Sequence, residues 1–122
     1  MCDSFMPSRI RANIGAMIVA FSVAPSFSDP HQGMAEAVAE AVRVVRESGL
    51  PNETNAMFTL IEGEWDEVMA VVKEATEAVS RVSPRTSLVL KADIRPGYSG
   101  QLRAKVAAVE AALADTENSE NK

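Results

Sequence analysis

The stretch TNAMFTLIEGEWDEVM, residues 54–69, changes character at its middle. Its first half alternates polar and apolar residues as far as Gly63, which is typical of a short strand buried on one side. Its second half starts with carboxylates and then carries apolar residues every three or four positions, which is typical of an amphipathic helix. Carboxylates in a first helical turn interact favourably with the exposed amides and the positive end of the helix dipole. The stretch therefore predicts a strand that runs into a helix almost without a loop.

Two regular segments precede this stretch. Residues 17–24, MIVAFSVA, carry large side chains at odd positions and mostly small ones at even positions, which predicts a strand whose two faces differ. Residues 34–49 place Val38 and Val45 on one side of a helix, and Gly49 supplies the left-handed backbone at which such a helix ends. A strand, a polar loop and an amphipathic helix are therefore expected before the quoted stretch.

The quoted stretch and the residues around it predict a strand pair and a second helix. Residues 52–63 are too short and too polar at their start for a helix, so they predict a tight pair of strands at about 53–56 and 58–62. A helix follows from about residue 64 to residue 82, and Trp65 falls on the apolar stripe that is expected to face the core.

The last two elements are a strand and a helix. Residues 85–96 alternate apolar and polar side chains until Pro96 and Gly97 end the strand. Ser99 is expected to cap a helix over 100–113, because its hydroxyl can accept a hydrogen bond from the first amides. The apolar residues of that helix follow a strict four-three-four spacing, which suits packing on another helix or subunit: Leu102, Val106, Val109 and Leu113.

The predicted order is strand, helix, strand, strand, helix, strand, helix. Two strand-helix-strand units with right-handed crossovers place both helices on the same side of one sheet. We therefore predict an α+β fold, a ferredoxin-like βαββαβ sandwich with an additional C-terminal helix. The domain is expected over 17–113, after a leader at 1–16 outside the fold and before a disordered tail at 114–122. The sheet face without helices needs a partner or forms a pocket, so we expect a homo-oligomer.

Composition narrows the classes of function. The chain has 122 residues, enough for one domain, and its 47% hydrophobic and 24% charged residues are typical of a globular protein. Acidic residues outnumber basic ones 17 to 12, and the basic ones are scattered, which argues against a nucleic-acid partner. Arg9 and Arg11, followed by an apolar run, have the pattern of a signal peptide. Met17 could instead be the start of the folded domain. The run is too short to span a bilayer, so no membrane partner is expected.

Catalytic and metal-binding groups are sparse in the sequence. The only histidine is His31 and the only cysteine is Cys2, so no nucleophilic triad can be placed and a soft-metal site within one chain is excluded. The acidic residues at 62–67 could hold a hard cation. Their favourable interaction with the start of a helix is, however, enough to explain why they cluster there. We therefore expect no catalytic activity, no cofactor and no metal.

Several segments resemble the thiamine-binding protein family, also called uncharacterised protein family 0045. The resemblance covers about residues 17–113, and its most specific part is IEGEWDEV at 61–68. It implies a ferredoxin-like fold, dimers that associate through their sheets into tetramers, a cytosolic setting, and binding of thiamin or its hydroxymethylpyrimidine moiety. Phe58 stands where many relatives have a small residue, which bears on the shape of the pocket. The segments that carry the resemblance are MIVAFSVAP at 17–25, VAEAVRVVRESGLP at 38–51, FTLIEGEWDEVMAVVKEATEAV at 58–79, LVLKADIRPG at 88–97 and the amphipathic KVAAVEAAL at 105–113.

Five residues are candidates to line the pocket that the resemblance implies. An aminopyrimidine needs an apolar slot for its ring and a few donors and acceptors at its edge. Ser22 can point a hydroxyl into a cavity, Asn55 offers a donor and an acceptor, and Thr59 lies nearby across the predicted hairpin. Met57 can form an adaptable apolar wall, and Glu62 can accept from a ligand amine or a cationic ring. The site is expected on the open sheet face near a subunit interface, with Glu62 at the corner where the strand runs into the helix.

Each candidate also has a simpler explanation. The first four could be residues of a subunit interface that are satisfied by backbone or water, and Glu62 could be a carboxylate bonded to the amides of a helix start. The function that the resemblance implies is a non-catalytic cytosolic protein that binds thiamin or hydroxymethylpyrimidine. The alternatives are a structural or regulatory homo-oligomer with no thiamin-specific role, and an enzyme of thiamin or pyrimidine metabolism.

Overall fold

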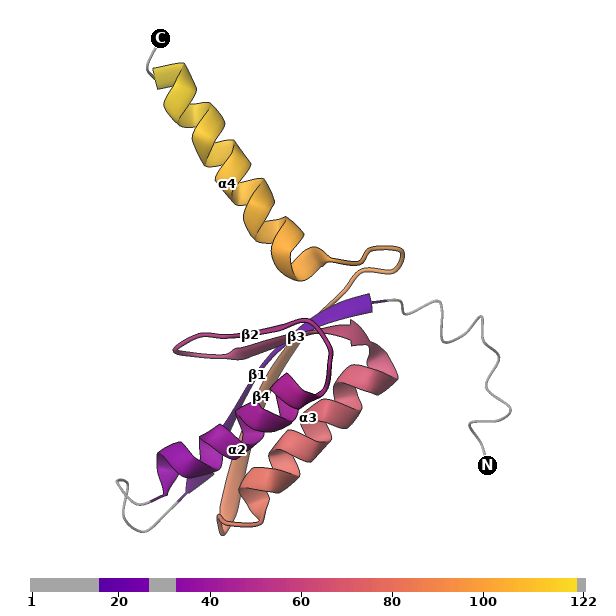
Figure 1. Ribbon diagram of the computed structural model, residues 1–122, viewed down its shortest axis with the longest axis vertical. Helices are drawn as coiled ribbons and strands as arrows, with labels where there is room; N and C mark the ends of the chain where they lie inside the picture. Colours follow the sequence, from indigo (N-terminus) through magenta and orange to yellow (C-terminus); the bar gives the residue numbers. More distant parts are fainter. Residues whose placement is uncertain (1–15, 27–32, 121–122) are drawn as a thin grey trace, which may run out of the picture.

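The computed structural model of the chain describes residues 16–26 and 33–120 (Figure 1). Their order confirms the predicted α+β fold, a ferredoxin-like βαββαβ arrangement followed by a C-terminal helix. The elements are β1 (Ala16–Ser26), α2 (Met34–Glu47), β2 (Asn52–Thr54), β3 (Thr59–Glu64), α3 (Trp65–Ser80), β4 (Arg85–Ile94) and α4 (Gln101–Glu120).

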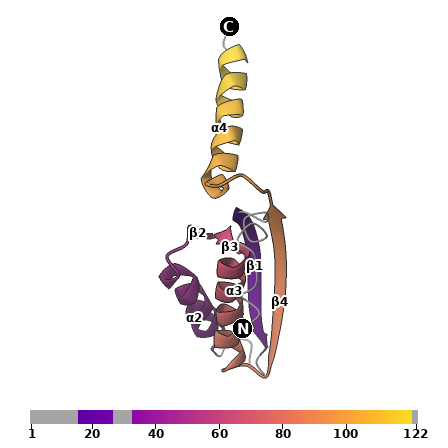
Figure 2. The same ribbon diagram turned by 90° about the vertical axis from the view of Figure 1, so that its right-hand side faces the viewer.

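The four strands form one antiparallel sheet in the order β2-β3-β1-β4. Helices α2 and α3 cover one side of this sheet, and α4 leaves its end and points away from it (Figures 1 and 2). The other side of the sheet has no helix over it in the described part of the chain, as the crossover argument predicted.

Alternation along the strands decides which residues enter the core. In β1, Met17, Val19 and Phe21 are buried under the helices, whereas the even-numbered residues between them face the open side. Directly opposite residues in an antiparallel pair share a face, so Ile61 of β3 joins the core because it pairs with Val19. The core is completed by apolar residues of the two helices, including Ala41, Val45, Val68, Val72, Ala75 and Val79.

The stripe expected on α3 is confirmed except at its first residue. Val68, Val72 and Val79 are buried, but Trp65 is 39% exposed and lies outside the core. Trp65 is the first residue of the helix, where the chain turns sharply out of β3, so its side chain does not lie over the sheet as the later stripe residues do. The predicted core position of Trp65 is therefore wrong.

Helix α4 differs from the predicted helix in its length and in its cap. It continues to Glu120, through most of the segment expected to be a disordered tail, although residues 114–120 are mostly polar. Leu102 is buried, whereas every residue from 103 to 118 is exposed. The expected cap residue Ser99 is not the group that bonds the first amides, which are bound from β3 instead.

The predicted leader at 1–16 lies outside the described residues, apart from Ala16, the first residue of β1. Cys2 and His31 also lie outside them. Among the described helices, none is both long and apolar enough to cross a bilayer.

Candidate functional site

A hollow of about 270 Å³ lies where β3 separates from β1. The pairing of β1 with β3 stops at Phe21 and Thr59, whereas its pairing with β4 continues to Ser26. Beyond Phe21, the β3 side of β1 therefore has no strand beside it within the described ranges.

Three elements form the walls of the hollow. The residues of α2 that reach it are spaced four apart, so they form one ridge along the helix. The hairpin between β2 and β3 supplies a second wall, and the end of β1 supplies the third. The lining residues are Met34, Val38 and Val42 of α2, residues 54–59 of the hairpin, and residues 21–25 of β1.

Four of the five candidate residues line this one hollow: Ser22, Asn55, Met57 and Thr59. Their position differs from the open sheet face that was expected. Thr59 pairs with Phe21 and therefore lies on the helix side, and Asn55 and Met57 belong to the turn between the strands. Ser22 lies on the open side, so the hollow wraps around the end of the sheet instead of lying on its face.

Asn55 shapes the turn with its side chain. Its Oδ1 accepts hydrogen bonds from the backbone N–H groups of Met57 and Phe58, each at 2.8 Å, and its own N–H donates to the Phe58 carbonyl at 2.9 Å. This is the local side chain to backbone bonding for which Asn is favoured in turns. The acceptor of Asn55 is therefore occupied, and its Nδ2 donates no hydrogen bond within residues 16–26 and 33–120. Only this amide donor remains for a ligand.

Glu62 does not reach the hollow and has a structural role. It is 4% exposed, and its two carboxylate oxygens accept the backbone N–H groups of Gln101 at 2.9 Å and Leu102 at 3.1 Å. A carboxylate at this place satisfies amides that have no partner within a helix and interacts favourably with the helix dipole. As the simpler explanation predicted, Glu62 is a carboxylate bonded to the amides of a helix start. The helix that it caps is α4 and not α3.

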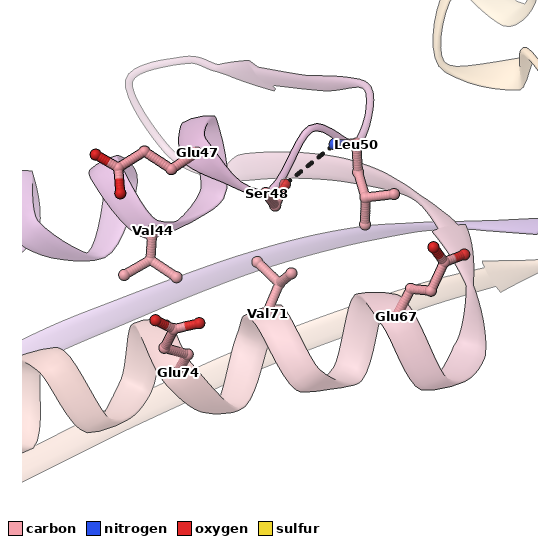
Figure 3. A pocket seen from close by; sticks show the side chains of 7 residues that line it. All are labelled: Val44, Glu47, Ser48, Leu50, Glu67, Val71 and Glu74. Atoms are coloured by element: carbon pink, nitrogen blue, oxygen red, sulfur yellow. Dashed lines mark hydrogen bonds between the residues drawn. The ribbon is translucent and has the colours of Figure 1, made fainter.

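A second hollow, of about 360 Å³, lies between α2 and α3 (Figure 3). Its floor is apolar, from Val44, Val71 and Leu50, and the carboxylates at its rim, among them Glu47 and Glu74, are exposed. The third of these carboxylates, Glu67, accepts a long hydrogen bond of 3.4 Å from the Glu64 N–H at the start of α3. Within the described ranges, no three His, Cys, Asp or Glu side chains come together in a metal-binding arrangement. The hollow at the hairpin offers better complementarity to a heterocycle, because its hydroxyl and amide groups stand beside apolar walls.

The sequence analysis did not identify the α2 ridge as part of the site. It named Phe58 only for its effect on the shape of the pocket. Val38 was predicted on the same apolar side of the helix as Val45, but the buried stripe of α2 consists of Ala37, Ala41 and Val45. The available signal was a second apolar row, since Met34, Val38 and Val42 repeat every four residues beside the buried one. An apolar stripe wider than the sheet can cover indicates a surface with a second use.

The chain belongs to the thiamine-binding protein family, whose model matches residues 19–110. UPF0045 protein Mb1933 of Mycobacterium bovis is 55% identical over 96 residues, which is 78% of this chain and 92% of that protein. UPF0045 protein sll0230 of Synechocystis is 38% identical over 74 residues, which is 60% of this chain and 61% of that protein.

Solved structures share the fold. The hypothetical protein MJ1052 of Methanocaldococcus jannaschii has a TM-score of 0.70 at 28% identity, over 78% of this chain and 96% of that one. A Thermotoga maritima protein assigned provisionally to thiamine biosynthesis or salvage has a TM-score of 0.64 at 24% identity, over 75% of this chain and 98% of that one. At that identity the Thermotoga structure shows the fold alone.

Proposed function

We propose that this chain is a non-catalytic protein that binds thiamin or its hydroxymethylpyrimidine moiety in the hollow at the β2–β3 hairpin. The observation that carries the proposal is the convergence of Ser22, Asn55, Met57 and Thr59 on one hollow. Each is a residue type that suits an aminopyrimidine, as the sequence predicts. Membership of the thiamine-binding protein family supports the same class of ligand.

The chemistry of the hollow suits a small aromatic ring with polar substituents. Val38 and Val42 on one side and Phe58 on the other supply apolar surface for the ring faces. The Asn55 amide, with the hydroxyls of Ser22 and Thr59, supplies donors and acceptors for the ring edge. A volume of about 270 Å³ lies just below the roughly 300 Å³ at which ligand pockets usually begin, so the pyrimidine moiety fits better than the whole of thiamin.

Calorimetric titration with hydroxymethylpyrimidine and thiamin tests the proposal. Asn55→Asp keeps the oxygen that holds the turn and removes the amide donor, and we expect it to weaken binding about tenfold through one lost hydrogen bond. Asn55→Ala also releases the turn and is expected to weaken binding further. Glu74→Gln, in the other hollow, is the control and should leave the affinity unchanged. A folded wild-type chain that gives no heat with either compound would contradict the proposal.

Filling the hollow is an independent test. Val38 is exposed on the α2 ridge, so Val38→Trp places a large ring in the hollow without disturbing the core. We expect binding to be lost while the far-ultraviolet circular dichroism spectrum is unchanged. The control is Lys73→Trp on α3, which is exposed and lines neither hollow, and it should bind normally.

We further propose that the protein acts in the cytosol as a homo-oligomer and that the site lies near a subunit interface. Exposed apolar side chains on β4 and α4 support self-association: Leu88, Val89, Ile94, Val106, Val109 and Leu113. The same observation favours the second candidate function, a structural or regulatory homo-oligomer with no thiamin-specific role. Oligomerisation without any binding of either compound would favour that second function, and turnover of a thiamin-like substrate would favour an enzyme.

A further inference from the structure

The hollow between α2 and α3 has an apolar floor and an acidic rim (Figure 3). Val44, Leu50 and Val71 form the floor, and each is only partly buried against the core, so each leaves apolar surface toward the hollow. The volume of about 360 Å³ is larger than that of the hollow at the hairpin. A further apolar side chain bound on this floor would be stabilised, because the removal of apolar surface from water is favourable.

The carboxylates at the rim have no cation beside them among the described residues. Glu47 of α2 and Glu67 and Glu74 of α3 stand at the rim, and no lysine or arginine lines the hollow. The two ion pairs within residues 16–26 and 33–120 involve other side chains and leave the rim uncompensated. Carboxylates above an apolar floor are complementary to an apolar side chain with a cationic side chain on each side of it.

The chain enters the described fold close to this hollow. Ala16, the first residue of β1, pairs with Glu64, the residue directly before α3. Figure 1 shows the start of β1 and the start of α3 at the same end of the sheet. Glu67 lies in the first turn of α3, so the rim begins within about one helical turn of the point where residues 1–15 join the fold.

Residues 1–15, which precede the described part of the chain, carry the complementary side chains. MCDSFMPSRIRANIG has two arginines against one aspartate, although the whole chain has a net charge of −5, and Ile10 stands between Arg9 and Arg11. The six residues from Ile10 to Ala16 reach about 20 Å when extended. Val71 lies seven residues along α3 from Glu64, which is about 10 Å, so the segment is long enough to reach the floor.

We propose that the segment around Ile10 binds in the hollow between α2 and α3 of the same chain, with Ile10 on the apolar floor and its two neighbouring arginines at the rim. One arginine meets Glu47 of α2 and the other meets Glu74 of α3, so the segment links the two helices across their outer surface. This hollow shares no lining residue with the hollow at the hairpin, so the inference is independent of the proposed ligand.

Disulfide formation tests the place of Ile10. In a Cys2→Ser background, Ile10→Cys with Val71→Cys should form a disulfide within one chain under mild oxidation, because docking brings the two side chains together. The control pairs Ile10→Cys with Lys73→Cys, an exposed position on the same helix that does not line the hollow. We expect the effective thiol concentration, measured in a glutathione redox buffer, to be about tenfold higher for the Val71 pair. Equal values, or a disulfide that joins two chains, would overturn the proposal.

Charge removal tests the rim. In the chain with cysteines at 10 and 71, Glu47→Gln with Glu74→Gln should lower the effective thiol concentration about threefold, because the two arginines lose their partners. The matched control is Glu36→Gln with Glu77→Gln, which removes the same charge from the same two helices outside the hollow. Equal effects of the two double variants would assign the attraction to net charge and overturn the contact with the rim.

A measurement without any change in the helices covers the case in which Val71→Cys fails to fold. Ile10→Ser alters only the segment, and we expect it to shift the NMR methyl signals of Val44, Leu50 and Val71, which form the floor. The methyl signals of Val109, exposed on α4, should stay in place. Floor signals that do not move would overturn the proposal in the otherwise unmodified chain.

Discussion

Helices α3 and α4 both carry apolar residues at helical spacing, but only α3 buries them. Val68, Val72 and Val79 of α3 are fully or almost fully buried on the sheet, whereas Val106 and Val109 of α4 are more than half exposed. Helix α3 is also the more strongly amphipathic of the two, and the surroundings of the two helices differ. An apolar stripe therefore shows that a helix has a face to cover, and it does not show whether the same chain covers it.

Helices α3 and α4 also differ in how contacts with the rest of the fold hold their ends. The segment after α3 is held by Ser83, whose hydroxyl accepts the Ser26 N–H at 2.8 Å and lies within hydrogen-bond distance of the carbonyl oxygens of Ser26 and Arg85. Within residues 16–26 and 33–120, the contacts that hold helix α4 lie at its start, from Glu62 and from the pair of Lys105 with Asp93. Helix α3 is thus part of the folding unit, while α4 is an arm fixed at one end.

The largest difference is expected from a charge placed on each stripe. Val72→Asp puts a carboxylate where no partner exists in the core, and we expect it to lower the free energy of unfolding by at least about 3 kcal/mol. Val109→Asp on α4 should change it by less than about 0.5 kcal/mol, because the site is exposed. Urea unfolding at low protein concentration measures both. Similar losses in the two variants would show that α4 is part of the core.

The next largest effect should come from the start of α4. Glu62→Ala removes the acceptor of two helix amides, and we expect a loss of about 1–2 kcal/mol, with faster hydrogen exchange at Gln101 and Leu102. Glu64→Ala, on the same strand but exposed, is the control and should leave exchange in α4 unchanged. Unaltered exchange in Glu62→Ala would mean that α4 does not depend on this cap.

A smaller effect is expected at the far end of α3. Ser83→Ala removes the hydroxyl that joins this segment to the end of β1, and we expect a loss of about 1 kcal/mol in the free energy of unfolding. Ser87→Ala, exposed on β4, should have no measurable effect. Equal stability of the two variants would show that the connection at Ser83 is dispensable.

The smallest effect concerns pH. The hydrogen bond from Lys105, followed by its charge, holds the pKa of Asp93 below its ordinary value of 3.8. The stabilisation from this pair is therefore complete above the unfolded-state pKa and is lost as the pH falls through the lower, folded-state pKa. We expect Lys105→Met to raise the pKa of Asp93 toward its ordinary value, as followed by NMR titration of the carboxyl carbon. A titration curve that does not move would assign the shift to another group.

Local pattern predicted most of the regular structure because that structure depends on neighbours in the chain. The alternation in residues 17–24 and Gly49 at the end of the first helix hold in the structure, where Gly49 has a φ of 79°. The prediction failed for Trp65, because helical spacing does not say how far the sheet reaches beneath the first turn. It also failed for the cap of α4, because Glu62 lies 39 residues before Gln101 in the chain.

The candidate site was predictable as a set of residue types and not as a place. Polar residues on a short strand and its turn, beside small residues of the first strand, indicated a pocket for a polar ring. Their place depends on where β3 stops pairing with β1 and on which row of α2 faces the hairpin. Neither is encoded by nearby residues, since both follow from the register of strands that are distant in sequence.

By itself, the sequence determined the order of the elements, the two faces of β1 and β4, and the family. Each of these follows from a pattern of residues within a few helical turns or one strand. Only the tertiary structure decided that Glu62 caps α4, that the hollow lies at the end of the sheet, and that the chain enters β1 beside the start of α3. The physical reason is that each of these is a contact, or an unfilled place for one, between segments that only the folded sheet brings together.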